Sequence, residues 1–452
     1  MNASGSIAYE KKIDEVIHTE VLVCGGGPAG TAAAISSARA GADTLLVEQN
    51  GFLGGTATVS EVAIWLGSFD RNGEYPVVGG IFRELLVELA EVGGAVLPED
   101  DIQIGEPSDP GVIGSPFIGY GPHGNSAPVK IEAVKRVSER FVLEAGSDIL
   151  YFTSAVEPVY ESGSLEGVVV FGKDGLRLIR TQVLVDATGD ADMLARAGGQ
   201  YRQGRDEDGK TTPATLMFSV SNVDAKEFTH YCKNTGDSRF RKVVSKLKEE
   251  EKWPFSFDIM IFMKRPFRKG HFLVNTLRQR YIDGTKAESL TEGMVNGRRQ
   301  ARQLFEIARE NVPGFSDAIF EGTAPRIGIR ESRRIVGEYT LSEEDIINGK
   351  SFKDTVAMSG YKWDLPDPDK PSVQEMEGRN MIKPYIEIPF RALLPKGVRD
   401  MIVPGRSLST TWHALGPVRE MPSCYAMGEA AGTAAAISLQ KSIELGDISP
   451  GE

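Results

Sequence analysis

Cysteine and histidine are scarce in this sequence, and their scarcity excludes several kinds of chemistry. There are three cysteines, Cys24, Cys232 and Cys424, and no two of them form a CxxC pair. This odd, scattered set excludes a disulfide framework and a redox-active dithiol, and it is typical of a reducing cytoplasm. The five histidines include no two at metal-ligand spacing, so we expect no metal site.

Long apolar runs and an excess of positive charge are missing as well. No stretch reaches the roughly 20 apolar residues that span a bilayer, and the N-terminal segment lacks the apolar core of a secretion signal. The formal net charge of −12 argues against binding to nucleic acid or to anionic membranes. A length of 452 residues suits about two or three domains. We therefore expect a cytoplasmic globular protein with no nucleic-acid or membrane partner, and we leave open whether it forms a homo-oligomer.

Glycine, in contrast, is abundant, and the segment VLVCGGGPAG at residues 21–30 concentrates it. A short buried strand is predicted over residues 21–23 and a helix of small residues over residues 31–39. Between them Gly25, Gly27 and Gly30 fit GxGxxG, in which the glycines allow a tight turn, close approach to a pyrophosphate and close helix–strand packing. The helix N-terminus then offers free N–H groups to phosphates. The segment therefore predicts a dinucleotide site.

An acidic residue at the expected distance supports this prediction. A second strand, predicted over residues 44–47, ends at Glu48, 18 residues after Gly30, where a carboxylate accepts hydrogen bonds from an adenosine ribose. The alternative is an ordinary surface glutamate. NAD and FAD share this half of a site, so later elements must distinguish them. A second glycine turn that suits a ligand longer than a nucleotide follows at once, with Gly54, Gly55, Thr56 and Thr58.

Two further strand–turn–helix elements follow. VLVDATGDADMLARAG, residues 183–198, has a turn with Ala187 and Gly189 and a helix opened by an acidic turn that includes Asp192. Residues 401–439 have a Gly405–Arg406 turn and a long helix, predicted to begin near Pro422 and to stop near Gly446. Small residues at spacings of three and four allow close approach of backbone or cofactor to this helix: Gly428, Ala431, Gly432 and Ala435. Its N-terminal dipole suits negative charge on a reduced flavin.

Together with APRIGIRESRRIVGEYTLSEED, these motifs resemble the FAD-dependent oxidoreductases among the glutathione-reductase-like and fumarate-reductase-related flavoproteins, over about residues 19–441. The resemblance implies non-covalently bound FAD and an α/β fold, with a discontinuous Rossmann-type FAD-binding domain and an inserted α+β substrate domain. We place the FAD domain at residues 19–205 and 395–445, with a loop-rich insertion at 66–128, and the substrate domain at 206–394. The expected cofactor contacts are Gly25, Gly27, Pro28, Ala29, Gly30, Glu48, Gln49, Gly54, Gly55, Thr56, Thr58, Val156, Ala187, Gly189, Asp192, Gly405, Arg406, Gly416, Val418 and Met421. The resemblance places Val156 in a turn that contacts the adenine through its backbone.

The remaining segments predict the rest of the architecture. The insertion is rich in Gly, Pro and Asp and predicts an active-site loop or an oligomer contact. A helix is predicted over residues 129–146, with strands near 149–153 and 167–171. In the substrate domain we expect strands LMFSVSNV (216–223) and FDIMIF (257–262), a charged helix through Lys248 between them, and a helix near 292–311.

A single dinucleotide loop limits the electron source. A disulfide reductase of this kind needs a second GxGxxG for a nicotinamide and a cysteine pair, and the sequence has neither. Electrons must therefore come from a substrate, a transiently bound nicotinamide or a partner protein.

Candidate catalytic side chains lie in the second half of the chain. His413, in TTWHALG, is the expected acid or base because imidazole titrates near neutral pH, and a structural histidine is the alternative. Relatives often carry histidine at the position of Trp412 and soon after the aspartate of WDLPDPD, residues 363–369, and this chain departs at both places. Cys424 falls in the first turn of the final helix, where a thiol pKa can be lowered, but small-residue packing is the favoured interpretation. Cys24 is expected to be a buried strand residue.

Arginines form the second group of candidates. PRIGIRESRRIVGEY contributes side chains that can bind a carboxylate or polarise a carbonyl: Arg326, Arg330, Arg333, Arg334 and Tyr339. Glu331 and Glu338 lie among them and predict internal ion pairs instead. Arg391 is another candidate anion anchor. We take His413, Tyr339 and Arg330 as the catalytic candidates.

These observations predict an FAD-dependent oxidoreductase that transfers a hydride between flavin N5 and a small organic substrate, with an anionic one favoured by the arginines. Two alternatives stay open. A flavin monooxygenase needs fast reduction by a nicotinamide, for which we find no dedicated second site. An electron-transfer subunit of a larger complex is the other, although no cysteine cluster for iron–sulfur ligation supports it.

Overall fold

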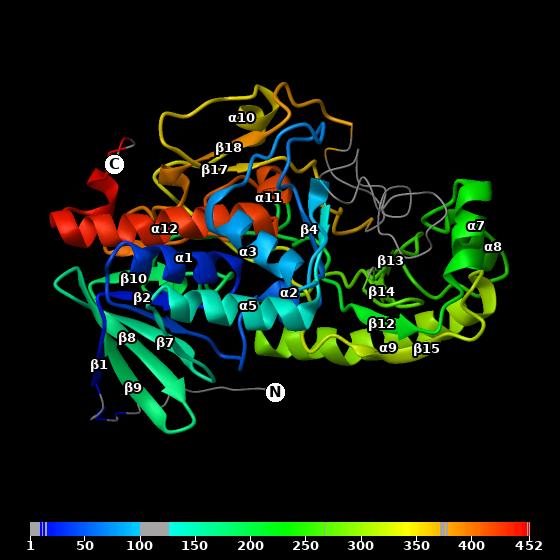
Figure 1. The fold of residues 1–452 in the computed structure, drawn as a ribbon, viewed down its shortest axis with the longest axis horizontal. Coiled ribbons are helices and arrows are strands. Elements are labelled where there is room, and N and C mark those ends of the chain that lie inside the picture. The colour runs from blue at the N-terminus through cyan, green and yellow to red at the C-terminus, as the bar shows by residue number, and fades with distance from the viewer. Residues whose placement is uncertain are drawn as a thin grey trace.

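A parallel sheet brings together the beginning and the end of the chain (Figure 1). The computed structural model describes residues 10, 12, 13, 16–99, 126–265, 267–370, 376, 378–449 and 451. Within these residues the sheet has five strands in the order β19-β10-β2-β3-β6, and every neighbouring pair is parallel. Their bounds are Met401–Ile402, Val183–Asp186, Val21–Cys24, Thr44–Val47 and Asp148–Leu150. The almost wholly apolar and buried strands β2, β3 and β10 are typical of a parallel sheet covered on both faces.

Different layers cover the two faces of this sheet. Val21 and Val23 point into a core shared with α1 (Pro28–Arg39), while Leu22 and Cys24 point into a core shared with a second sheet, of order β1-β9-β8-β7. The strands of that sheet are Val16–His18, Gly175–Arg180, Ser164–Gly172 and Ser154–Glu161. On the α1 side lie α3 (Gly80–Glu91), α5 (Ile131–Glu144) and α12 (Met421–Lys441). Figure 1 shows this three-layer arrangement on its left-hand side.

The helices α1 and α12 pack unusually closely because glycine and alanine line their contact. A Cβ atom added to Gly428 would lie 2.0 Å from the carbonyl oxygen of Ala29, and one added to Gly432 would lie 2.1 Å from that of Ala33. Both contacts advance by four residues in the same direction, so the two helices run parallel. The small-residue spacing of the final helix therefore serves backbone packing.

A second unit, formed by part of the segment in which we expect the substrate domain, lies at the right of Figure 1. Its antiparallel sheet has the order β13-β14-β12-β15, with bounds Phe262–Lys264, Phe272–Val274, Phe218–Ser221 and Ile319–Thr323. Helices α7 (Ala225–Thr235), α8 (Arg241–Glu249) and α9 (Ala287–Asn311) pack on it around an aromatic core. The α/β fold with an inserted α+β unit is therefore confirmed.

Short elements connect the larger units. The pairs are β4 with β5 (Ile64–Leu66, Ser126–Pro128), β11 with β16 (Tyr201–Gln203, Arg333–Ile335) and β17 with β18 (Thr355–Ser359, Ile386–Pro389). The short helices are α2 (Thr56–Val59), α6 (Asp192–Arg196), α10 (Glu343–Ile347), α11 (Trp412–Val418), η1 (Phe390–Ala392) and η2 (Leu445–Asp447).

Several local predictions were wrong. The insertion at 66–128 contains the helix α3, and its part from residue 100 to 125 lies outside the described residues. The helix expected through Lys248 is two helices, α7 and α8, and only the last residue of FDIMIF belongs to a strand. The final helix ends at Lys441, where Ser442 has a left-handed backbone, and not near Gly446. Val156 lies inside strand β7 and not in a turn.

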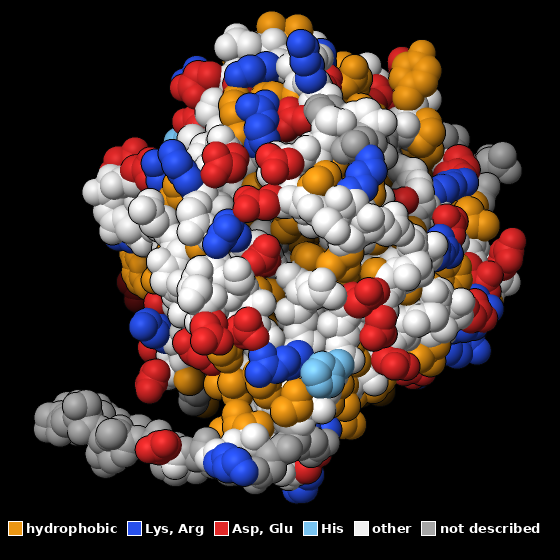
Figure 2. Space-filling view, turned by 90° about the vertical axis from the view of Figure 1, so that its left-hand side faces the viewer, with side chains coloured by type: hydrophobic (Ala, Val, Ile, Leu, Met, Phe, Trp, Pro, Cys, Tyr) orange, Lys and Arg blue, Asp and Glu red, His pale blue; other side chains and the backbone are white. Residues whose placement is uncertain are grey.

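The described part of the surface has a mixed character. Figure 2 shows one face, on which acidic and basic side chains are interspersed and neither sign of charge forms a continuous patch. No helix in the described part of the chain combines the length and apolar character needed to cross a membrane.

Candidate functional site

The glycine loop after β2 forms a cradle at the carboxyl edge of the parallel sheet. Gly25 has φ +104°, and a Cβ there would lie 2.5 Å from the carbonyl oxygen of Ala187, after the neighbouring strand β10. A Cβ on Gly30 would lie 1.7 Å from the carbonyl oxygen of Gly25. The first turn of α1 has no side-chain cap, so its N–H groups are available to a ligand. The loops after β2 and β10 leave for opposite sides of the sheet, which is where open α/β sheets bind ligands.

Glu48 locks this cradle to the next strand. Its Oε2 accepts a hydrogen bond from the Gly26 N–H at 2.7 Å, and its Oε1 accepts from the Asn50 N–H at 2.8 Å and from Asn50 Nδ2 at 2.6 Å. The residue is only 6% exposed, so the surface alternative is wrong. A carboxylate accepts about four hydrogen bonds, so Glu48 keeps capacity for a ribose, which stays a prediction.

The second glycine turn lies directly against the first. The Gly54 N–H donates to the Gly26 carbonyl oxygen at 2.8 Å, and a Cβ on Gly55 would lie 2.8 Å from the Gly27 Cα. Thr58 is buried and donates its hydroxyl to the Leu53 carbonyl oxygen at 2.9 Å, so this side chain stabilises the turn itself. Gln49 is exposed.

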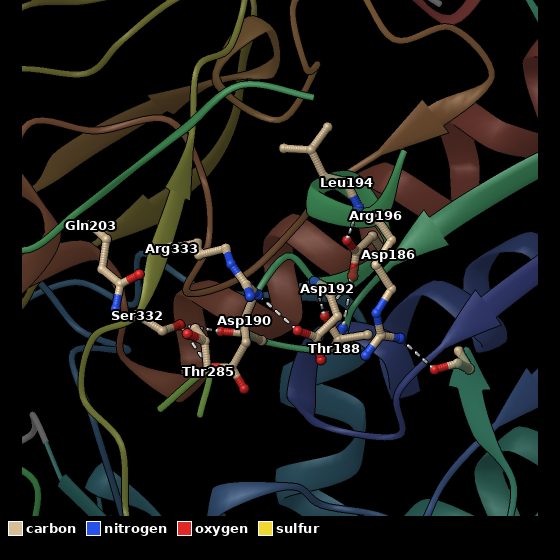
Figure 3. A network of polar contacts seen from close by, with 12 residues as sticks. Asp186, Thr188, Asp190, Asp192, Leu194, Arg196, Gln203, Thr285, Ser332 and Arg333 are labelled. Carbon is tan, nitrogen blue, oxygen red and sulfur yellow. Dashed lines mark hydrogen bonds and ion pairs between the residues drawn. The ribbon is translucent and has the colours of Figure 1, made fainter. Parts of the chain in front are cut away.

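A polar network holds the DATGDAD turn in place (Figure 3). Buried Asp186 accepts from the Thr188 hydroxyl at 2.6 Å and from the Leu194 N–H at 3.0 Å. Asp192, expected at the cofactor, pairs with Arg333 at 2.8 Å, and Ser332 donates to Asp190 at 2.6 Å. The network therefore joins this turn to the arginine-rich segment, as Figure 3 shows.

Arg406 extends this network to the last strand. Its Nε donates to the Gly189 carbonyl oxygen at 2.8 Å, its Nη2 pairs with Asp190 at 2.6 Å, and its Nη1 donates to the Ile329 carbonyl oxygen. Gly405 has φ +90°, and a Cβ there would lie 3.1 Å from the Ala29 Cβ and 3.9 Å from Cys424 Sγ. The turns after β2, β10 and β19 thus meet beside the N-termini of α1 and α12.

The N-terminus of α12 projects beyond that of α1. Gly428, which contacts Ala29, is the eighth residue of α12, while Ala29 is the second residue of α1. Because the helices are parallel and rise 1.5 Å per residue, α12 begins about 9 Å beyond the start of α1. A cofactor whose pyrophosphate lies at α1 can therefore extend along this step to the first turn of α12.

Four charged side chains surround that first turn. Arg419 Nη2 pairs with Asp364 at 3.0 Å and its Nη1 pairs with Glu420 at 3.2 Å. Arg330 donates to the Pro213 carbonyl oxygen and to the Thr215 hydroxyl, both at 2.7 Å. Glu420 is the N-cap residue of α12 and is 9% exposed. Burial, the largest cause, and the charge of Asp364 raise its pKa to about 7, against the opposite effect of Arg419 and Arg330. A carboxyl that titrates near neutral pH is suited to proton transfer.

A buried ion pair lies beside this cluster. Arg334 and Glu331 are 0% and 1% exposed and pair at 2.6 Å, and Arg334 also donates to the Gly204 and Thr410 carbonyl oxygens. Trp412 Nε1 donates to Glu331 Oε2 at 2.9 Å. Trp412, at a position where the family resemblance leads us to expect histidine, therefore satisfies a buried carboxylate.

Two of the expected acid–base side chains, His413 and Tyr339, contact α10. His413 Nδ1 lies 3.4 Å from Glu343 Oε1, and the His413 side chain is 28% exposed. Tyr339 donates to Asp345 at 2.7 Å and accepts from Lys350 at 2.6 Å, and burial, the largest cause, raises its pKa. His413 thus contacts Glu343, and Tyr339 contacts Asp345. Arg330 is held by different residues, Pro213 and Thr215.

Other sequence-based candidates serve the packing. Arg391 pairs with Asp354 at 2.9 Å, so the ion-pair interpretation holds for Arg391 as for Arg333 and Arg334. Burial raises the pKa of the Cys424 thiol to about 12, in agreement with the packing role favoured for it over a lowered pKa, and Cys24 is a buried strand residue as predicted. Arg326 meets α2 through its backbone N–H.

The remaining expected cofactor contacts lie on β7, α11 and α12 and in the first turns of α1 and α2. The Ala155 and Val156 carbonyl oxygens both accept from Arg196 Nη1 at 2.8 Å. A Cβ on Gly416 would lie 3.1 Å from the Asp364 carbonyl oxygen, and Val418 and Met421 are buried. Pro28, Ala29 and Thr56 lie in the first turns of α1 and α2.

Glu420, Arg419 and Asp364 were missed by the sequence analysis. A signal existed, because VREMP places an arginine and a glutamate directly before a helix that opens with proline. Separately, a cavity of about 490 Å³ lies between α12 and β17, lined by residues that include Val77, Phe390, Ala430 and Ile437. None of the expected cofactor contacts lines this cavity.

Comparison with known proteins identifies the family. The family model described as FAD dependent oxidoreductase matches residues 20–452. Thiamine thiazole synthase from Aeropyrum pernix is 29% identical over 199 residues, which cover 42% of this chain and 61% of that protein. Digeranylgeranylglycerophospholipid reductase 1 from Methanopyrus kandleri is 25% identical over 191 residues, which cover 41% of this chain and 43% of that protein. The chain thus spans only part of the length of these curated relatives.

Solved structures align with most of the chain at low identity. L-proline dehydrogenase from P. horikoshii covers 94% of each chain, with 12% identity and a TM-score of 0.44. A geranylgeranyl bacteriochlorophyll reductase-like protein from Thermoplasma acidophilum covers 94% of this chain and 80% of its own, with 12% identity and a TM-score of 0.47.

Because the family model matches nearly the whole chain, this protein belongs to the FAD-dependent oxidoreductases, a family of enzymes. NAD and FAD share the first half of such a site, so the glycine loop alone does not distinguish them. The prediction of FAD rather than NAD agrees with the family. The glycine cradle, whose closest contacts leave no room for side chains, fits a dinucleotide pyrophosphate.

Proposed function

We propose that this enzyme binds FAD non-covalently and transfers a hydride between the flavin N5 and a small organic substrate. The projection of α12 beyond the phosphate cradle, ending in a cluster of Arg330, Asp364, Arg419 and Glu420, is the observation that carries this proposal. When bound, the flavin supplies the hydride chemistry, and the protein has to orient the substrate and manage charge and protons.

Each group of residues has a distinct part in this proposal. The first turn of α1 and the glycine turns hold the pyrophosphate, and Glu48 accepts from the ribose. Arg330, held at 2.7 Å by two oxygens, orients an anionic substrate group with its guanidinium charge. His413, oriented by Glu343, exchanges a proton with the substrate.

Non-covalent binding is supported by the state of the thiols. All three cysteines are buried, and burial, the largest cause, raises the pKa of each thiol, so that the thiolate needed for attachment is disfavoured. The cytoplasmic location stays a prediction, and whether the protein forms a homo-oligomer stays open.

The proposal is tested first on the purified protein. We expect a yellow protein with about one FAD per chain, consistent with its one cradle, which denaturation releases. Anaerobic mixing with a panel of small metabolites, anionic ones included, should then bleach the flavin absorbance. A colourless protein that added FAD cannot reconstitute would overturn the proposal.

A further inference from the structure

Glu420 occupies a special place in the charge balance of the site. Its carboxyl lies directly before the first residue of α12, beyond the phosphate cradle, and it is 9% exposed. Four charged groups interact here: the cations Arg419 and Arg330 and the carboxylates Asp364 and Glu420. With both carboxylates ionised, these four charges sum to zero.

The other titratable groups that face Glu420 do not alter this balance at neutral pH. Cys424, one turn along α12, is a protonated thiol because burial raises its pKa to about 12. Tyr361, which interacts with Arg419, is a buried phenol. A full negative charge that arrives beside this neutral cluster meets only the partial positive charge of the α12 N-terminus, and the remainder is expensive in a site screened so little by water.

We propose that Glu420 binds one proton when the cofactor at the N-terminus of α12 is reduced, and releases that proton on reoxidation. The proposal rests on the proposed function, because it requires FAD in the cradle. A hydride from the substrate brings two electrons and one proton to the cofactor, which thereby gains one negative charge. The Glu420 carboxylate takes a further proton from solvent and becomes a neutral carboxylic acid, and the total charge of the site is restored.

The pKa of Glu420 sets the pH range in which this uptake occurs. Its value of about 7 applies before reduction, and a negative charge nearby raises it further. Extra uptake is therefore expected above pH 7, up to the raised value. Below about pH 6 the carboxyl is protonated in both redox states, and no extra proton is bound.

The test measures protons without measuring turnover. The midpoint potential of the bound FAD, recorded between about pH 5 and 9, gives the number of protons bound per two electrons from its slope against pH. Just above pH 7 we expect wild-type protein to bind up to about one proton more than Glu420→Gln. Glu429→Gln is the matched control, since Glu429 lies on the same helix and burial raises its pKa too, but its Oε2 accepts from the Ile81 N–H, away from the cluster. It should match wild type.

Equal proton uptake in wild type and Glu420→Gln over the whole pH range would overturn the inference. If Glu420→Gln fails to hold FAD, Asp364→Asn replaces it. Because the Asp364 charge raises the pKa of Glu420, its removal should move the extra uptake to lower pH. An unchanged pH range in Asp364→Asn would also overturn the inference. Failure of wild-type protein to bind FAD would instead contradict the proposed function.

Discussion

Replacing Gly428 by alanine tests the contact that positions both helix N-termini. Alanine normally stabilises a helix relative to glycine, by about 1 kcal/mol. At Gly428, however, the added Cβ would lie 2.0 Å from the Ala29 carbonyl oxygen and 2.7 Å from the Ala29 Cα. The obstructing atoms are backbone, so α12 must move away from α1 by about 1.4 Å to bring this 2.0 Å approach to an ordinary contact of 3.4 Å.

The magnitude follows from these two effects. Overpacking of a well-packed interior costs about 1–3 kcal/mol, and the upper end applies because backbone cannot rotate aside. After the gain in helix propensity, a net loss of about 2 kcal/mol remains. FAD affinity should fall as well, since the displacement separates the N-termini of the two helices. Gly432→Ala should destabilise the Gly428→Ala protein less than it destabilises wild type, because one displacement of α12 relieves both contacts.

The control is Gly293→Ala, another glycine inside a long helix. A Cβ there would meet only side-chain atoms among its nearest neighbours, the Ile327 Cδ1 at 3.0 Å and Ile282 atoms at 3.3 and 3.6 Å. These flexible ends yield by a few tenths of an ångström, so this variant should be neutral or more stable. The assay is urea unfolding followed by circular dichroism and by release of flavin fluorescence. A Gly428→Ala protein as stable as Gly293→Ala would refute the reasoning.

Three further predictions concern the site. Glu48→Ala should weaken FAD binding by about 1.5–3 kcal/mol, measured by titrating apoprotein, and unchanged affinity would exclude a ribose contact. His413→Gln should keep FAD at wild-type stoichiometry but slow anaerobic single-turnover flavin reduction by about 10²-fold, whereas rates within about threefold would remove His413 from the mechanism. Arg334→Met should cost about 3–5 kcal/mol in urea unfolding because it leaves Glu331 charged and buried, and adding Glu331→Gln should recover part of that loss. No recovery would show that packing, and not charge, dominates there.

The phosphate cradle could be predicted from the sequence because its determinants are local. The strands at 21–24 and 44–47 and the helix α1 lie within a residue or a few of their predicted positions. Gly30 meets the Gly25 carbonyl oxygen within the same short motif, whereas Gly25 meets the Ala187 carbonyl oxygen after β10. The motif spacing, with Glu48 at the end of the next strand, therefore indicates the dinucleotide site, although one wall of the cradle comes from far along the chain.

In two places the local sequence pattern predicts a structure that the chain does not adopt. Residues 257–262 form an apolar run interrupted only by Asp258, and its apolar side chains are buried mostly without strand pairing, because apolar character reports burial and not backbone conformation. The helix α3 was hidden in a segment described as loop-rich, although its buried positions recur at helical spacing: Ile81, Phe82, Leu85, Leu86 and Leu89. Averaging composition over a long insertion obscured that period.

The charged end of the site could not be predicted, because its members meet only in the folded chain. Asp364 reaches Arg419 from 55 positions away, and Glu331 reaches Trp412 from 81 positions away. Whether a glutamate is an exposed charge or a buried proton carrier depends on such partners and on desolvation, and neither is written in neighbouring residues.

Tryptophan at position 412, where the family resemblance leads us to expect histidine, separates two tasks that one histidine could combine. Trp412 is buried and donates to Glu331, so it stabilises the fold beside the cluster but cannot carry a proton at neutral pH. His413 is partly exposed and faces Glu343, whereas Glu420 is buried beside two arginines. We therefore expect loss of His413 to change the rate of substrate oxidation and loss of Glu420 to change the proton count of flavin reduction. A chain in which either substitution changed both quantities equally would have one proton path, and the separation argued from Trp412 would be wrong.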